Sequence, residues 1–180
     1  MIFKTYTVVF EGVEARCIEV QCALSAGLPG FSIVGLPNKA VSEARDRVRS
    51  ALASMSIALP SKRITVNLSP ADLPKDGSHF DLPIALALMA AIGVIAQDAC
   101  ENTVSLGELS LDGALVPVRG ALPAAVTAAG SDRLLICPRA CGPEAAWVAH
   151  AQVIGADSLW DIIQHVHGQK PIPTPPAGAT

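Results

Sequence analysis

Hydrophobic and polar residues alternate along the start of the chain in the manner of half-buried strands. Residues 5–10 and 14–24 show this alternation, and Glu11-Gly12 between them is typical of a turn. We therefore expect an opening β-hairpin. A short apolar strand follows within residues 27–37, where three glycines and two prolines fix its ends by turn chemistry.

The hydrophobic period then changes to that of helices. Apolar residues recur at three- and four-residue spacing from Val41 to Met55, and Asn38 is the expected N-cap of this helix. Residues 64–68 have the apolar pattern of a strand. Residues 82–95 are apolar on nearly every face, which predicts a second helix that is buried all round.

Short strands and helices alternate in the second half of the chain. We expect a hairpin formed by residues 103–109 and 114–118, with Asp112-Gly113 as its turn. The last helix should begin after Ser158 as N-cap. The other expected elements are two helices and two short strands, at residues 120–129, 158–166, 134–137 and 152–154. This interleaved pattern predicts a single α/β domain.

Composition limits the size and class of the protein. With 180 residues, 51% of them hydrophobic, the chain can bury one domain and leave a short remainder. A net charge of -3 means that any nucleic-acid contact has to be local. The chain starts without the apolar core of a signal peptide and has no run that could span a bilayer, so we expect a cytoplasmic protein without a membrane partner. Its five cysteines lack zinc-site or CxxC spacing, so reduced thiols and no metal are expected.

The composition changes near residue 168. Beyond it, four prolines stand among small residues, a composition typical of an extended linker rather than a folded element. We therefore divide the chain into a domain at residues 1–168 and a proline-rich linker at residues 169–180.

The turn between the strand at residues 64–68 and the helix from residue 82 is rich in reactive side chains. Its polar and flexible residues are Lys75, Asp76, Gly77, Ser78, His79 and Asp81. One interpretation makes Lys75 and Asp76 solvated turn charges, Gly77 a residue with positive φ, and Asp81 the helix N-cap. The other makes the turn a contact site for a partner or a nucleic acid, since a strand-to-helix turn can present backbone N–H groups.

Several motifs, in their order along the chain, resemble one known family. They lie at residues 27–29, 33–37, 41–49, 70–85, 105–113 and 116–120. The most specific is Pro-Lys-Asp-Gly-x-x-Phe-Asp-Leu-Pro at residues 74–83. Together they resemble the N-terminal domain of the magnesium-chelatase-like ComM (YifB) proteins over residues 3–168. That resemblance implies a Lon-like fold, related to domain 2 of ribosomal protein S5.

The resemblance also implies a longer protein. In that family an AAA+ ATPase module of the same polypeptide follows the linker, binds ATP and Mg, assembles as a hexameric ring and moves branched DNA during recombination in natural transformation. The present domain would then shape the ring, contact DNA, or do both without catalysis. No glycine in the chain is followed by lysine, so a Walker-type phosphate loop is missing and no cofactor is expected in this segment.

The Lon resemblance raises a serine-peptidase alternative, since Lon proteases use a serine activated by a lysine. His79 stands where the Lon pattern has its serine, and residues 117–125 contain no lysine where that pattern has one. A substitute dyad would pair Ser78 or Ser69 with Lys75 or His79. A protein-interaction or scaffold module without DNA binding is the other alternative.

Basic residues are concentrated between residues 39 and 75. The candidates for DNA contact are Arg45, Arg47, Arg49, Lys62, Arg63 and Lys75. Acidic residues are mixed with them, so a solvated helix face is the competing interpretation. Only Phe31 and Phe80 stand near enough to offer stacking to single strands. Repetition of weak phosphate contacts around a ring would strengthen such binding.

Overall fold

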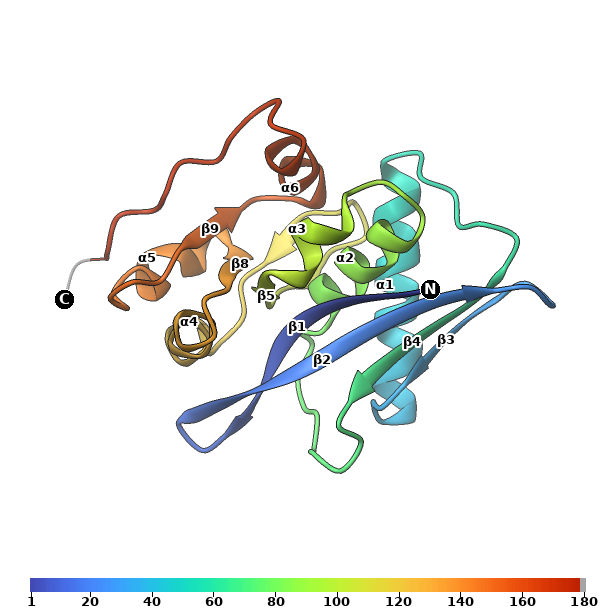
Figure 1. Ribbon diagram of the computed structural model, residues 1–180, viewed down its shortest axis with the longest axis horizontal. Helices are drawn as coiled ribbons and strands as arrows, with labels where there is room; N and C mark the ends of the chain where they lie inside the picture. Colours follow the sequence, from blue (N-terminus) through green and yellow to red (C-terminus); the bar gives the residue numbers. More distant parts are fainter. Residues whose placement is uncertain (179–180) are drawn as a thin grey trace.

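A seven-stranded sheet organises the chain (Figure 1), and the computed structural model describes residues 1–178. The strands of this sheet lie in the order β3-β4-β2-β1-β5-β8-β9. Their bounds are Ile2–Glu11 (β1), Glu14–Ser25 (β2), Gly30–Val34 (β3), Arg63–Ser69 (β4), Thr103–Ser105 (β5), Leu134–Pro138 (β8) and Val153–Ala156 (β9). A separate two-stranded ladder consists of β6 (Glu108–Leu109) and β7 (Leu115–Val116). The helices are α1 (Asn38–Ser54), α2 (Asp81–Ala91), α3 (Gln97–Glu101), α4 (Ala121–Gly130), α5 (Gly142–Ala145), α6 (Leu159–Val166) and the short 3-10 helix η1 (Arg139–Cys141).

The sheet joins an antiparallel part to a parallel part. β1 and β2 form the predicted opening hairpin, and β2 also pairs antiparallel with β4. β1 is parallel to β5, as are β5 to β8 and β8 to β9. β3 is parallel to β4, and α1 makes the crossover between them, running back along β3. The α/β fold predicted from the sequence is confirmed.

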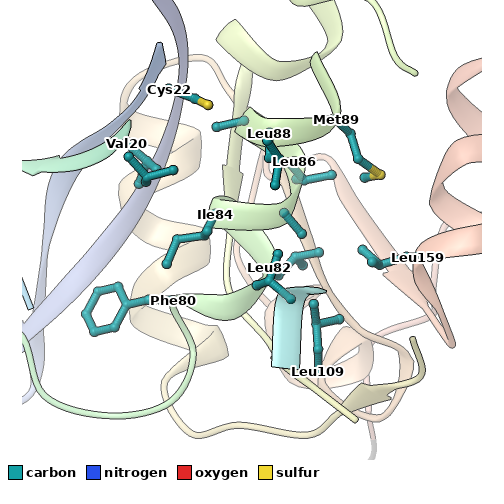
Figure 2. Close-up of a cluster of buried hydrophobic side chains, with 14 of the residues drawn as sticks. Val20, Cys22, Phe80, Leu82, Ile84, Leu86, Leu88, Met89, Leu109 and Leu159 are labelled. Atoms are coloured by element: carbon teal, nitrogen blue, oxygen red, sulfur yellow. The ribbon is translucent and has the colours of Figure 1, made fainter. Parts of the chain in front are cut away.

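Helices cover the two faces of the sheet unequally. The larger hydrophobic core holds residues of α1, α2, α3 and α6, and the smaller one holds residues of α4 and α5. α2 is the centre of the larger core, because every residue from Asp81 to Ala90 is buried. Figure 2 shows its apolar side chains between Val20 and Cys22 of β2 and Leu159 of α6. The prediction of a helix buried all round is confirmed, and each large apolar side chain there contributes about 1.5–3 kcal/mol.

The expected hairpin at residues 103–109 and 114–118 is wrong in its first strand. Residues 103–105 are all buried and enter the large sheet between β1 and β8, so only β6 and β7 remain as a short hairpin. The predicted turn is confirmed: Gly113 has a φ of +89°, and the Asp112 carboxylate accepts a hydrogen bond from the Ala114 N–H at 3.1 Å. The helix expected to reach residue 95 ends earlier, at Ala91, and Gly93 follows with a φ of +83°.

Two of the three expected N-caps are wrong. Pro37 precedes α1 and Phe80 precedes α2, and neither Asn38 nor Asp81 makes a side-chain capping hydrogen bond. Asp81 is the first residue of α2, and its carboxylate is directed to other partners described below. The third expectation is confirmed, since Ser158 Oγ accepts a hydrogen bond from the Asp161 N–H at 3.2 Å.

The proline-rich segment contains no helix or strand over residues 169–178, yet it does not extend away from the domain. It runs back past β9 toward α5 (Figure 1). Residues 179–180 of the expected linker lie outside the described residues. None of the helices in residues 1–178 is both long and apolar enough to pass through a membrane.

Candidate functional site

Lys75 lies inside the turn that connects β4 to α2. Its side chain is buried, with the residue only 4% exposed, and Nζ donates hydrogen bonds to the carbonyl oxygens of Pro70 at 2.8 Å and Leu73 at 3.0 Å. The interpretation of Lys75 as a solvated turn charge is therefore wrong. Its ammonium group holds the turn together, because the carbonyls that it binds belong to the same loop. Asp76 is exposed, and Gly77 has the predicted positive φ, at +102°.

His79 attaches the same turn to the sheet. Its Nε2 atom lies 2.7 Å from the Val8 carbonyl oxygen, and because a carbonyl only accepts, Nε2 carries the proton. The imidazole packs against Phe80 at 4.1 Å and Phe10 at 5.3 Å between ring centroids. Burial lowers the pKa of His79, and the hydrogen bond to Val8 opposes this only in part.

We expect stability to depend on pH through His79. Because its pKa is lower in the folded than in the unfolded state, the unfolded chain binds more protons below pH 6.5, so the free energy of unfolding falls as the pH drops from 7.5 toward 5.5. Urea unfolding across this range should show a smaller fall for His79→Gln, whose amide can still donate to Val8. An equal fall in both proteins would contradict a role for His79.

Asp81 and Arg47 form an ion pair between α2 and α1. Arg47 Nε lies 2.6 Å from Oδ2 and Arg47 Nη2 lies 3.1 Å from Oδ1, while the Leu109 N–H donates to Oδ2 at 3.0 Å. Burial raises the pKa of the Asp81 carboxyl. The hydrogen bond between the two side chains raises the pKa of Arg47. The three hydrogen bonds favour the charged pair, since each one stabilises a carboxylate. The pair thus locks the start of α2 to α1 and to β6.

A groove of about 340 Å³ lies between the start of α1 and the turn. Lys39, Arg47, Ser78 and Asp81 contribute to its walls, while Lys75 and His79 do not. Over residues 1–178, the hydrogen bonds of Lys75 Nζ and His79 Nε2 go to backbone carbonyls rather than to Ser78 or Ser69. The geometry therefore gives no support to the substitute peptidase dyad.

Four of the six candidate DNA-contacting residues gather near the start of β3. Arg45 Nη1 donates to the Phe31 carbonyl at 3.3 Å, and Arg49 lies one turn further along α1, which returns beside β3. Arg63 pairs in register with Gly30, and Lys62 precedes it. We call Arg45, Arg49, Lys62 and Arg63 the basic cluster. Arg47 and Lys75 do not join it, because Asp81 and the turn carbonyls engage their cationic groups.

The salt bridges found within residues 1–178 include none that involves the basic cluster. Arg49, Lys62 and Arg63 are exposed and Arg45 is half-buried. The acidic residues that the sequence places among them are therefore not neutralising these cations by direct contact. The cluster can offer its charge to an anionic partner.

Sequence reasoning missed the link between Arg47 and Asp81. The sequence marked Arg47 as a surface cation and Asp81 as a cap, because each fits its local helix pattern. The two residues are 34 positions apart, and no local signal connects them. One indication is present in the sequence: Asp81 stands in an otherwise apolar segment, where a carboxylate requires a partner.

The cysteines are mostly buried thiols. Burial raises the pKa of Cys22, Cys100 and Cys137 to about 12, so these thiols stay protonated at neutral pH. Cys17 is exposed. In the described part of the chain, no group of three or more His, Cys, Asp or Glu side chains is arranged to hold a metal ion.

Comparison with known proteins gives consistent similarities. Residues 18–140 match the family model described as subunit ChlI of Mg-chelatase. The chain is 44% identical over 162 residues to competence protein ComM of Haemophilus influenzae, covering 90% of this chain and 32% of that protein. It is 41% identical over 164 residues to YifB of Escherichia coli and 40% identical over 164 residues to YifB of Salmonella typhimurium, covering 91% of this chain and 32% of each relative. The chain therefore spans about a third of the length of these relatives.

Proposed function

This chain belongs to the family of the Mg-chelatase subunit ChlI, and from that premise we propose that it is a DNA-contacting domain of a longer ATPase. The observation that carries the proposal is the basic cluster of Arg45, Arg49, Lys62 and Arg63. These residues place four cations around one edge of the sheet in a chain whose net charge is -3. A protein with a negative net charge can contact phosphates only through a local positive surface of this kind.

The full-length protein would supply the motor. We place ATP and Mg on an AAA+ module of the same polypeptide and this domain beside it, in a homohexameric ring that moves branched DNA during recombination. The name competence protein, carried by one relative, supports a role in handling incoming DNA. In a ring the basic cluster would occur once per subunit, so weak individual contacts would act together. The domain itself would bind DNA and shape the ring without catalysing a reaction.

DNA binding by the basic cluster can be measured by fluorescence anisotropy with single-stranded, duplex and four-way DNA at two salt concentrations. Changing all four residues to alanine should weaken binding on the order of 10²-fold at low salt. Binding should weaken because each alanine removes a phosphate contact. Each lost contact should also lower the salt dependence, by about 0.9 in the slope of log K against log salt. The loss should be similar for all sequences, because phosphate contacts do not read bases.

Arg139→Ala is the matched control. Arg139 is an exposed arginine whose ion pair with Asp157 has a length of 3.1 Å, and it lies on the far side of the sheet order, beyond β8. Its loss should change affinity by less than about twofold. If the domain binds no DNA even at low salt, or if Arg139→Ala weakens binding as much as the quadruple alanine substitution does, the basic cluster is not a DNA site.

A protein-interaction role is the second candidate, and one surface favours it. A groove of about 380 Å³ lies between the β1–β2 turn and α4, and its lining includes the exposed side chains of Val13, Leu122 and Val126. Exposed apolar residues that gather in a groove are typical of protein contacts. Substitution of Val13 and Val126 by serine should leave DNA affinity unchanged if the basic cluster is the DNA site.

A further inference from the structure

The proline-rich segment at residues 170–178 is seated on a surface formed by η1, α5, β9 and α6. Three of its residues are partly buried there, Ile172, Pro175 and Gly178, while the residues between them are exposed. The spacing of three is the repeat of a polyproline II helix, which has three residues per turn. The segment thus turns every third residue toward the domain, as a polyproline II helix can do.

Each of these three residues makes its own contact with the domain. The Ile172 N–H donates to His165 Nδ1 at 2.8 Å, and the Ile172 side chain packs against the larger core. The Gly178 N–H donates to the Pro143 carbonyl at 3.0 Å. Pro175 lies over Gly142, so closely that a Cβ atom added to Gly142 would be 3.1 Å from the Pro175 ring. We call the receiving surface, formed by Gly142, Pro143 and His165, the proline groove.

The hydrogen-bonding pattern of the groove suits a proline-rich ligand. Four of the eight residues from 171 to 178 are prolines and have no N–H to donate. The groove offers acceptors at two of the four remaining amides, those of Ile172 and Gly178, and an open glycine surface where a ring has to fit. A polyproline helix also loses little conformational entropy when it binds, because it is largely formed beforehand.

The seated segment does not fill the space beneath it. A cavity of about 390 Å³ remains between the segment and the domain, lined by Arg139, Gly155, Asp157 and Asp161 among others. The connection to α6 passes through Gly168, whose φ of +75° marks a sharp change of chain direction. A segment held at three points over an incompletely filled cavity, behind a glycine turn, can leave at the cost of two backbone hydrogen bonds and the contact of Ile172 with the larger core.

We propose that the proline groove is an exchangeable docking site, at which residues 170–178 of a second copy can replace those of the same chain. The contacts are the same in both cases, so the choice depends on effective concentration rather than on new chemistry. Exchange of this segment would link copies through a short peptide-like contact. This role is independent of DNA binding, since the basic cluster lies at the opposite end of the sheet order.

The test uses the full chain and a labelled synthetic peptide covering residues 169–180. The double substitution Ile172→Ser and Pro175→Ser weakens the attached tail and leaves the groove intact. Fluorescence anisotropy should show that this released-tail protein binds the peptide at least about tenfold more tightly than the wild type does, because the wild-type tail competes at millimolar effective concentration.

Gly142→Leu in the released-tail protein should abolish peptide binding. Apart from the Pro175 ring, the nearest atom to an added Cβ is Gly155 Cα at 3.8 Å, so the closest contacts of that Cβ are with the occupant of the groove. Gly130→Leu is the matched control, since no atom lies within 4 Å of its added Cβ, and it should bind like the parent. A peptide carrying the two serine substitutions should not bind.

Three outcomes would overturn the proposal. They are no peptide binding to the released-tail protein up to about 1 mM, equal binding to the wild type and the released-tail protein, and equal binding of the native and serine-substituted peptides. If Gly142→Leu fails to fold, the two peptides and the two tail variants still decide the question.

Discussion

Arg47→Ala is expected to destabilise the domain by about 3–5 kcal/mol, because it leaves the Asp81 carboxylate buried without its cationic partner. The Asp81 side chain is 1% exposed, whereas the Arg47 side chain is 22% exposed. Asp81→Ala should therefore cost less, about 1–3 kcal/mol, since the freed guanidinium can turn toward solvent or toward Glu43, 3.8 Å away. Urea unfolding at pH 7 measures both losses.

Lowering the pH should reduce the loss of stability that Arg47→Ala causes. Without the arginine, only the Leu109 N–H still opposes the burial that raises the pKa of Asp81, so the folded variant binds the extra proton at a higher pH than the wild type does. The stability gap to the wild type should thus narrow from pH 7 to pH 5. Arg49→Ala, a change to an exposed arginine on the same helix, should alter stability by no more than about 0.5 kcal/mol. A gap that is independent of pH would show that Asp81 is not the affected group.

Gly35→Ala is expected to cost about 3 kcal/mol or more. Gly35 has a φ of +106°, which strains any residue with a side chain, and an added Cβ would lie 2.7 Å from the Leu68 carbonyl oxygen. That oxygen belongs to β4, which pairs with β2 and β3 on its two sides, so the backbone cannot move away. The strain and the close contact therefore add, and the unfolding free energy measures their sum.

Gly12→Ala separates these two effects. Gly12 also has a positive φ, at +61°, but no atom lies within 4 Å of its added Cβ. It should lose only about 1–2 kcal/mol, the cost of the left-handed conformation alone. If the two alanine variants have the same stability, the contact with Leu68 does not restrict Gly35.

Local patterns predicted the elements whose contacts are local in the sequence. The β1–β2 hairpin follows from strict alternation around one turn, and α2 follows from a continuous apolar segment. β5 was not predictable as a member of the large sheet, because its three residues resemble the start of a hairpin with β7. Their inclusion depends on neighbours that approach from both sides, among them Thr5, whose hydroxyl donates to the Thr103 carbonyl across 98 positions.

In the candidate site, too, the sequence predicted the local features and missed those that depend on distant residues. The concentration of arginine and lysine near α1 was visible in the sequence, but which four of them share a surface depends on the return of α1 along β3. Lys75 was misjudged because its partners are backbone carbonyls, and the sequence does not show where a loop directs its carbonyl groups. The seat of the proline-rich segment was also not visible, since Gly142 and Pro143 carry no signal of what they bind.

The position of β1 inside the sheet has a consequence for synthesis on the ribosome. Residues 2–25 can form their hairpin as soon as they emerge, but the other edge of β1 pairs with Val104 of β5. At 5–20 residues per second, translation takes roughly 4–16 s to supply that partner. During this interval the nascent chain displays an unpaired ten-residue strand edge, the kind of edge that recruits strands from other chains. Newly made chains are thus most prone to aggregate before residue 104 has been synthesised, and slower translation lengthens the exposure.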